Sequence, residues 1–278
     1  MQRSAVLVTY RTGPVLFDCL NALLADGDID EIVIVDNGNP ADLQHRLDAM
    51  HAQHDRLRLL RGQGNVGFAR GCNLGAQAAN GERILFINPD VVVARGAAQR
   101  MSETLDGLPM PSVVGGDLRN VEGGPDRGSR RDRVTPWRAF VSYSGLSRLG
   151  RWIAACRDLH RHEEPMPNEA VRVGAISGAL LMMRRADFVV LNGFDEDYFL
   201  HFEDVDLCRR IEEAGGAVVF LPGAIGVHMR STSDAPASWV TRHKLRGLAR
   251  YVRKFAQSPA ERALANVMHG AVKMFLPV

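Results

Sequence analysis

Three apolar segments of the sequence end in side chains that could bind a charged ligand. These side chains are Thr9, Tyr10 and Arg11 after the first segment, Asp36 and Asn37 after the second, and Asn88 and Asp90 after the third. Ligands of open parallel sheets bind beyond the carboxyl ends of the strands. Asp and Asn are also common turn formers, so one such end would be uninformative. Three together favour a binding site.

The residues after the first apolar segment do not form a phosphate-binding glycine loop. A dinucleotide-binding unit would place Gly-x-Gly-x-x-Gly there, and a P-loop would place Gly-Lys-Ser or Gly-Lys-Thr. Residues 9–14 instead read Thr-Tyr-Arg-Thr-Gly-Pro. Phosphate would then be held most simply by a divalent cation on carboxylate oxygens. Asp90, which follows the apolar residues 84–87, is the best candidate ligand, with a turn-forming or helix-capping Asp as the alternative.

Residues 203–214 predict a helix with one carboxylate on its apolar side. At about 100° per residue, Leu207 and Ile211 belong to the apolar stripe and Asp204 falls within it, whereas Asp206 falls on the opposite, solvated side. An Asp in the first turn of a helix is also favoured by the helix dipole, which is the alternative explanation. A carboxylate that points into the protein or a cleft could act as a general base.

Residues 65–73 open a predicted helix in which Gly67, Gly71 and Gly75 recur at every fourth position. Glycines on one helix face allow close approach to a sheet or a ligand, at about 1 kcal/mol each relative to Ala. Packing alone could explain the spacing, and Arg70 near the helix start only suggests ligand contact.

The elements that must position these residues follow from the hydrophobic pattern. The predicted strands are residues 5–10, 31–36, 56–61 and 83–87, and the predicted helices are 15–25, 41–54, 67–80 and 96–105. This alternation predicts an α/β fold with a largely parallel sheet. The Gly-, Asp- and Arg-rich residues 120–136 predict a long mobile loop. Regular structure is predicted again at residues 171–183, 204–214 and 217–221, followed by a helical tail from Trp239.

The composition bounds the class of protein. The chain has 278 residues, of which 46% are hydrophobic and 24% charged, which is typical of a folded globular protein. No internal repeat is visible, and one elaborated domain is expected. A net charge of +2 predicts no nucleic-acid partner. The four cysteines form no Cys-x-x-Cys pair, which favours a reducing cytosol. No segment is apolar for long enough to span a bilayer.

Together these segments resemble the inverting glycosyltransferases of family 2, which have the GT-A nucleotide-sugar-binding fold, and in particular their rhamnosyltransferase-like branch. The resemblance runs from about Val6 to about Phe255. It is carried, in order, by Val8-Thr9-Tyr10, Val35-Asp36-Asn37, residues 65–73, Asn88-Pro89-Asp90, Ser177-Gly178-Ala179, Gly193-Phe194-Asp195-Glu196, Glu203-Asp204-x-Asp206 and His228. It implies a catalytic domain of residues 1–238, with a nucleotide-sugar half at about 1–117 and an acceptor half at about 118–238, and a helical extension of residues 239–278.

The resemblance also implies roles for individual residues. Those around the nucleotide would be Thr9, Tyr10, Arg11, Asp36, Asn37, Asn65 and Arg70, with Asp36 reading a pyrimidine base. Asp90 and His228 would hold Mg²⁺ or Mn²⁺ near the diphosphate, although a lone His is usually structural. Asn88 replaces the first Asp of the family's Asp-x-Asp motif and removes one negative charge; without metal, Arg70 or Arg230 would neutralise the phosphates. Asp204 would be the catalytic base, and Ser177, Gly178 and Glu203 would line the acceptor side.

The reaction implied is transfer of a sugar, for this branch rhamnose from dTDP-rhamnose, to a hydroxyl of a saccharide acceptor in cell-surface polysaccharide synthesis. One displacement with inversion needs one base, whereas retention would need a second carboxylate, and no convincing partner for Asp204 is visible. Two alternatives remain open. A nucleotidyltransferase would be expected to have a Gly-rich loop after the first strand, and a non-catalytic nucleotide-sugar-binding protein would need no base.

The C-terminal residues predict a basic amphipathic helix. Residues 239–256 carry Arg242, Lys244, Arg246, Arg250, Arg253 and Lys254 and no acidic residue, with Leu245, Leu248, Tyr251, Val252 and Phe255 at helical spacing. This helix either lies on an anionic membrane, which would suit a lipid-linked acceptor and a peripheral enzyme at the inner, cytoplasmic face, or packs on the catalytic domain. The next helix, residues 260–275, would extend that membrane face or form a homodimer contact.

Overall fold

The N-terminal part of the chain folds as alternating strands and helices, as its hydrophobic pattern predicts. The computed structural model describes residues 1–229 and 236–275. Its first elements are β1 (Arg3–Thr9), α1 (Val15–Ala25), β2 (Glu31–Asp36), α2 (Ala41–Gln53), β3 (Leu57–Leu60), α3 (Phe68–Ala78), β4 (Arg83–Ile87), β5 (Val91–Val93) and α4 (Ala97–Asp106). The eight elements predicted here are confirmed, each within two residues at either end.

The second part of the chain is less regular. It contains β6 (Ser112–Arg119), β7 (Arg130–Arg131), α5 (Pro136–Ser144), the 3₁₀ helices η1 (Leu146–Leu149) and η2 (Ala154–Cys156), β8 (Val171–Arg172), β9 (Ala175–Ile176), β10 (Leu180–Arg184), α6 (Arg185–Val190), α7 (Glu203–Glu213), β11 (Ala217–His228), α8 (Ala237–Phe255) and α9 (Pro259–Phe275). The predicted mobile loop at residues 120–136 is wrong, because Asp126 and Arg130 are buried and β7 pairs with β9. Its Gly and Asp residues form tight turns, in which Asp126 Oδ1 accepts from the N–H of Gly128 at 2.8 Å.

The main sheet has the order β3-β2-β1-β4-β10-β6-β11-β5, and β8 pairs with β11. Strands β3, β2, β1 and β4 are parallel to one another, β10 is antiparallel to both of its neighbours, and β6 and β11 are parallel. Six of the nine strands in the described part of this sheet therefore run in one direction, which confirms the predicted, mostly parallel sheet. Parallel strands deliver the residues after β1, β2 and β4 to the same edge.

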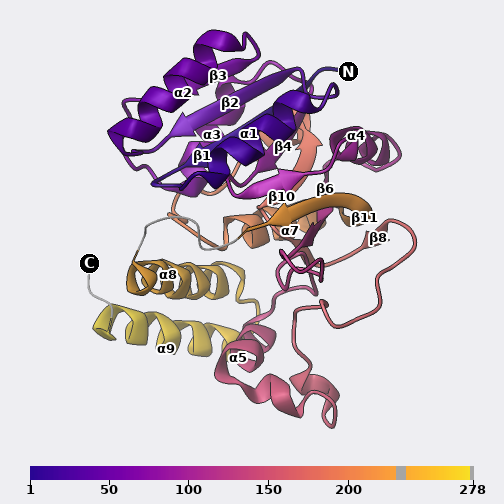
Figure 1. Cartoon of the computed structure of the whole chain (residues 1–278). Helices are drawn as coiled ribbons and strands as arrows, with labels where there is room; N and C mark the ends of the chain where they lie inside the picture. Colours follow the sequence, from indigo (N-terminus) through magenta and orange to yellow (C-terminus); the bar gives the residue numbers. More distant parts are fainter. Residues whose placement is uncertain (230–235, 276–278) are drawn as a thin grey trace.

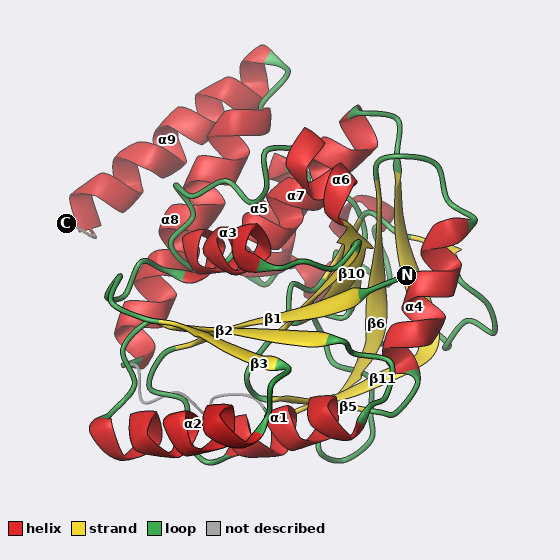
Figure 2. Ribbon diagram, turned by 90° about the horizontal axis from the view of Figure 1, so that it is seen from above, coloured by secondary structure: helices red, strands yellow, loops and turns green. Residues whose placement is uncertain are grey.

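Helices cover both faces of the sheet (Figure 2). One core contains Leu16 and Leu20 of α1, Leu47 of α2 and Met101 of α4, and the other contains side chains of α3, α6 and α7. Helix α3 lies very close to the sheet. A Cβ added at Gly75 would be 2.4 Å from Cγ1 of Val6. The sequence left two explanations for the glycine spacing, packing and ligand contact. At Gly75 the explanation is packing against the sheet.

The two C-terminal helices pack beside α5 and α7 at one end of the molecule (Figure 1). Leu248, Tyr251 and Val252 of α8 are buried, so the apolar stripe of this helix faces the rest of the protein. Lys254 Nζ contacts the carboxylates of Asp195 at 2.7 Å and Asp206 at 2.6 Å. No helix of the described residues is long and apolar enough to cross a membrane. Residues 230–235 and 276–278, including Arg230, lie outside the described residues.

Candidate active site

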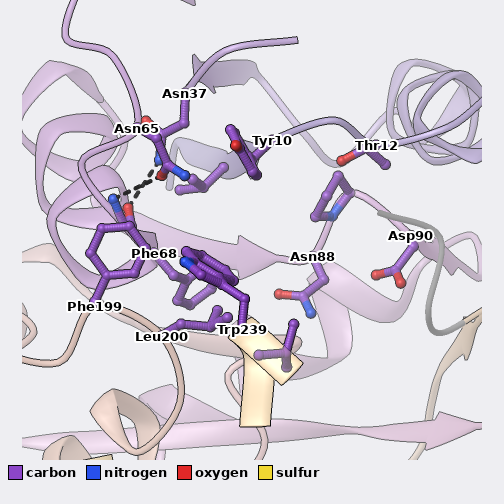
Figure 3. Close-up of a pocket in the computed structure, with 14 residues that line it drawn as sticks. Tyr10, Thr12, Asn37, Asn65, Phe68, Asn88, Asp90, Phe199, Leu200 and Trp239 are labelled. Atoms are coloured by element: carbon purple, nitrogen blue, oxygen red, sulfur yellow. Dashed lines mark hydrogen bonds between the residues drawn. The ribbon is translucent and has the colours of Figure 1, made fainter. Parts of the chain in front are cut away.

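A pocket opens beyond the carboxyl ends of β1, β2 and β4, where the polar strand ends were predicted to meet (Figure 3). Its walls are Val8, Tyr10, Thr12, Asn37, Asn65, Gly67, Phe68, Asn88, Pro89, Asp90, Phe199, Leu200, Trp239 and Val240. Asn37 and Asn65 lie at one end, Asn88 and Asp90 at the other, and Trp239 lies between them. The structure thus brings all three polar strand ends into one cavity.

Two asparagines connect the end of β2 to the start of α3. Asn37 Nδ2 donates a hydrogen bond to the Gly67 carbonyl at 3.0 Å, and the Gly67 N–H donates to Asn65 Oδ1 at 3.2 Å (Figure 3). Gly67 has a φ of 86°, and a Cβ there would lie 2.6 Å from the Phe199 carbonyl oxygen. Glycine is therefore required at this turn, both for the backbone conformation and for the close approach. Tyr10, Asn37 and Asn65 are the predicted nucleotide-binding residues that line the pocket.

Asp36, predicted to read the base, does not line this pocket. It is buried, and Oδ1 accepts from the backbone N–H groups of Gly38 at 3.0 Å and Asn39 at 2.9 Å. Its other oxygen, Oδ2, accepts from Arg61 Nε at 3.0 Å. In this structure the carboxylate therefore fixes the turn after β2, and base recognition by Asp36 stays a prediction.

Three other predicted nucleotide-binding residues also lie outside the pocket wall. Thr9 is fully buried, and its Oγ1 donates to Thr12 Oγ1 at 3.0 Å. Arg11 is exposed and has a φ of 47°. The Arg70 side chain is exposed and lies 3.7 Å from the carboxylate of Glu196. Their contact with a nucleotide stays a prediction.

Asp90 and His228, the predicted metal ligands, lie next to each other. Asp90 Oδ1 is 3.3 Å from His228 Nε2, and Nδ1 of the same ring is 3.2 Å from Asp126 Oδ2. Burial disfavours the charged ring, but the hydrogen bonds to Asp126 and Asp90 outweigh it and raise the pKa of His228 to about 9.

These residues would fit a divalent cation, held also by the diphosphate, once His228 gives up a proton, because only the neutral imidazole binds a metal and both ring nitrogens now face carboxylates. A carboxylate is a common ligand of Mn²⁺ and Mg²⁺, and a carboxylate on the second ring nitrogen orients a metal-binding His. The described residues contain no cluster of three or more acidic, His or Cys ligands. A cation here would therefore complete its coordination with ligand oxygens and water.

Asp204, the predicted base, lies in the first turn of α7 and is nearly buried. Oδ2 accepts from Arg131 Nη2 at 2.7 Å and from the Gly178 N–H at 3.0 Å, and Oδ1 accepts from the Val205 N–H at 2.8 Å. Burial alone would raise the pKa of Asp204, but the Arg131 charge and these hydrogen bonds outweigh it and lower the pKa. The carboxylate is thus ionised and held in one orientation.

Gly178, which was predicted to line the acceptor side, lies directly against Asp204. A Cβ added at Gly178 would lie 3.2 Å from Asp204 Cβ and 3.8 Å from Cε1 of Phe68, a pocket residue. Asp204 and the pocket residue Phe68 therefore both lie next to Gly178. Ser177 Oγ accepts from the Ala179 N–H at 3.2 Å, which shapes this turn.

Glu203 and Asp206 flank Asp204 and are both buried. Burial and, as a smaller contribution, the negative charge of Asp204 raise the pKa of Glu203 to about 8. No hydrogen-bond partner of Glu203 Oε2 occurs among the described residues. The prediction that Asp206 lies on a solvated face is wrong, because Asp206 is fully buried between Arg210 and Lys254. Helix α8 covers that face, and the periodicity of α7 alone does not reveal this cover.

Sequence reasoning missed four residues of the site. Phe199 and Trp239 line the pocket with their ring centroids 5.5 Å apart, and both rings pack against His243. Arg131 and Asp126 come from the segment that was predicted to be a mobile loop. The two aromatic residues have a weak signal in the sequence, because they are aromatic side chains next to motifs. Arg131 and Asp126 have no such signal, because the residues that they contact are about 70 and 100 residues away.

Comparison with known families and relatives identifies the chain. The model of glycosyl transferase family 2 matches residues 4–187, and a model described as the N-terminal domain of galactosyltransferase matches residues 161–232. An N-acetylglucosaminyl-diphospho-decaprenol L-rhamnosyltransferase of Mycobacterium tuberculosis is 29% identical over 253 residues, which cover 86% of this chain and 80% of the relative. The rhamnosyltransferase WbbL of Escherichia coli K12 is 35% identical over 79 residues, 27% of this chain and 30% of that protein.

Solved structures share the fold at low sequence identity. The structure of GalNAc-T7 with UDP, GalNAc and Mn²⁺ has a TM-score of 0.67 and 13% identity, and the match covers 99% of this chain and 56% of that one. The mannosyltransferase PcManGT of Pyrobaculum calidifontis, solved with GDP-Man and Mn²⁺, has a TM-score of 0.61 and 16% identity over 99% of this chain and 70% of its own. Both are GT-A glycosyltransferases. This chain therefore belongs to glycosyl transferase family 2 and is a glycosyltransferase with the GT-A fold.

Proposed function

We propose that this protein transfers rhamnose from a nucleoside-diphosphate donor, dTDP-rhamnose, to a hydroxyl of a lipid-linked saccharide, with inversion at the anomeric carbon. The names of the rhamnosyltransferase relatives support rhamnose as the transferred sugar, and the diphospho-decaprenol acceptor in the name of one relative supports the lipid-linked acceptor. We propose a role in cell-surface polysaccharide synthesis at the cytoplasmic side of the membrane. The four cysteines are free and buried, which suits a reducing compartment.

One observation carries the proposed chemistry: a single oriented, ionised carboxylate lies beside the pocket. Asp204 would accept the proton of the acceptor hydroxyl as that oxygen forms its bond to the anomeric carbon. The bond from the anomeric carbon to the diphosphate breaks in the same step, and the nucleoside diphosphate leaves with the electron pair. Arg131 and the Gly178 N–H hold the carboxylate in place during this transfer.

The pocket residues would bind the donor. Tyr10, Asn37 and Asn65 would contact the nucleoside, and Asp90 with His228 would hold a Mg²⁺ or Mn²⁺ ion. Such an ion would stabilise the charge that grows on the departing diphosphate. Asp126 orients the His228 ring for this role.

Release of nucleoside diphosphate tests the proposal. The purified protein is incubated with a panel of nucleotide sugars and a polyprenyl-diphosphate N-acetylglucosamine acceptor, and the anomeric configuration of the product is read by NMR. The proposal expects release that depends on the acceptor and is fastest with dTDP-rhamnose. Formation of a nucleoside triphosphate and a sugar 1-phosphate when pyrophosphate is added to the nucleotide sugar would identify a nucleotidyltransferase. Donor binding without turnover for every sugar and acceptor would identify a binding protein.

A further inference from the structure

The segment between β7 and β8 exposes large apolar side chains next to arginines. Residues 133–157 contain five arginines and no Lys, Asp or Glu. Trp152 is 77% exposed, Ile153 48% and Leu149 43%. We define the arginine–tryptophan surface as Arg148, Leu149, Arg151, Trp152, Ile153 and Arg157, all of which are exposed.

The positive charges of this surface are not neutralised by the rest of the described chain. Arg148, Arg151 and Arg157 form no ion pair with any acidic residue in the ranges 1–229 and 236–275. The guanidinium of Arg151 lies 5.5 Å from the centroid of the Trp152 ring. By contrast, Arg250 and Lys254 of the basic helix α8 are both paired with Asp195. The positive charge of the arginine–tryptophan surface, at and next to η1 and η2, is therefore unpaired within the described residues, whereas Arg250 and Lys254 near the C-terminal end of α8 are paired.

The two ends of this segment are tied together beside the candidate base. Arg131, which contacts Asp204, forms a β-bridge with His160, and the Asp132 N–H donates to the Leu159 carbonyl at 2.8 Å. Between these anchors the chain leaves the sheet, and Figure 1 shows it at the end of the molecule opposite α2.

Internal contacts keep this excursion ordered. Thr135 caps α5 by accepting from the Arg138 N–H at 3.2 Å, and Trp137 Nε1 donates to the Ala155 carbonyl at 2.8 Å. The second contact holds η2 against α5. The exposed side chains are thus presented by a packed unit rather than by a free strand of chain.

We propose that the arginine–tryptophan surface docks this protein on an anionic lipid bilayer. Arginines pair with phosphate headgroups, Trp is favoured at the boundary between headgroups and acyl chains, and Leu and Ile enter the apolar side of that boundary. The surface lies on a projecting end of the molecule, which suits a flat partner. A polyanion without an apolar phase would leave the exposed Trp, Ile and Leu unexplained. Docking would turn the Arg131 side of the active site toward acceptors in the membrane; this consequence rests on the proposed function.

Flotation of the full-length protein with lipid vesicles tests the surface directly. Vesicles of phosphatidylcholine alone are compared with vesicles of equal parts phosphatidylcholine and phosphatidylglycerol, in low and high salt. We expect binding only to the anionic vesicles in low salt. The double variant Arg148→Gln/Arg151→Gln should lower the partition coefficient about 25-fold, at roughly fivefold for each basic residue. Trp152→Ala should lower it several-fold.

A matched control variant removes the same number of positive charges from another part of the surface. Arg46 of α2 and Arg95, two residues before α4, are exposed, and Figure 1 shows α2 and α4 away from α5, the helix that η1 contacts. The double variant Arg46→Gln/Arg95→Gln should change vesicle binding less than twofold. Equal melting temperatures of the variants and the wild type show that folding is intact.

Several outcomes would overturn the proposal. One is no binding of the wild type to anionic vesicles in low salt, and another is loss of binding on Arg242→Gln/Arg246→Gln but not on Arg148→Gln/Arg151→Gln, which would assign the contact to α8. Equal binding to dextran sulfate, unaffected by Trp152→Ala, would indicate a polyanion partner, and a dimer that Trp152→Ala dissociates would indicate a second copy. Vesicle binding is measured without donor or acceptor, so it can fail while sugar transfer holds.

Discussion

Asp204 is an unusual base candidate because a cation already contacts it. The Arg131 contact lowers the pKa of Asp204, which makes the carboxylate a weaker base but keeps it ionised. A weak base in a fixed position still accepts a proton once the attacking oxygen has lost electron density to the anomeric carbon. Orientation rather than basicity is therefore the contribution that this environment favours.

Replacing that carboxylate tests its role. Asp204→Asn keeps the shape but cannot accept a proton, so kcat should fall by roughly 10² to 10⁴ while donor affinity stays nearly unchanged. Turnover is measured by nucleoside diphosphate release and affinity by calorimetry. Asp197→Asn, at an exposed side chain that pairs with Arg250, is the matched control and should keep wild-type turnover. Substantial turnover of Asp204→Asn would exclude Asp204 as the base.

Glu203 makes the stability of the protein depend on pH. Its pKa of about 8 in the folded state exceeds the value of about 4 for an unfolded Glu. The folded protein therefore binds the extra proton, and this contribution to stability is complete below about pH 4 and is lost as the pH rises through about 8. Glu203→Gln cannot ionise. It should match the wild type near pH 5 and exceed it at pH 9 by on the order of a few kcal/mol in urea unfolding. Parallel stability profiles would show that Glu203 is ionised in the folded protein.

The residues around His228 predict a metal-dependent donor affinity. Asp90→Ala removes a ligand candidate, and Asp126→Ala removes the carboxylate that orients the His228 ring. In the presence of Mn²⁺, both variants should bind the donor more weakly than the wild type, with a loss of about 10- to 100-fold for Asp126→Ala. In EDTA, the loss of donor affinity should be much smaller. Titration calorimetry with the nucleotide sugar measures this difference. If the wild type binds donor equally well with Mn²⁺ and with EDTA, the site works without a metal ion.

At the scale of elements, α3 can lie this close to the sheet because glycine, which has no side chain, occupies the contact at Gly75. Gly75→Ala would place a methyl group 2.4 Å from Val6 Cγ1, and overpacking of this kind costs about 1 to 3 kcal/mol. Gly270→Ala in α9 meets nothing within 4 Å and should stabilise the protein by up to about 1 kcal/mol through helix propensity. Urea unfolding of both variants gives the comparison. Equal effects of the two substitutions would mean that α3 can move away from β1 at no cost.

At the scale of the whole molecule, the pocket is closed by a helix from the far end of the sequence. Trp239 and Val240 of α8 form a wall opposite residues that follow β1 and β4, so the donor site is complete only when the C-terminal helices are packed. The ion pairs of Lys254 with Asp195 and Asp206 hold α8 to the segment around α7. This arrangement couples the helical extension to the donor pocket.

Removing the wall should weaken donor binding. Trp239→Ala should raise the KM for the nucleotide sugar several-fold with a smaller effect on kcat, because the ring forms a wall of the pocket and has no part in the proposed proton transfer. Trp239→Phe, which keeps an aromatic ring against Phe199, should restore most of the affinity. Steady-state kinetics with varied donor distinguishes these effects. An unchanged KM for Trp239→Ala would mean that the donor does not contact this wall.

The amino-acid pattern was sufficient for the alternating strands and helices of the first half, and for the meeting of Asn37, Asn88 and Asp90 in one pocket. Both follow from short-range rules: apolar strands buried on two faces, and parallel strands that end at one edge. Arg131 at Asp204, Asp126 at His228 and Trp239 in the pocket wall were decided by tertiary structure alone. Their partners are distant in sequence, and periodicity within one segment carries no information about which other segment covers it. Asp206 shows the reason most directly, since its helix pattern places it in solvent and α8 buries it beside Lys254.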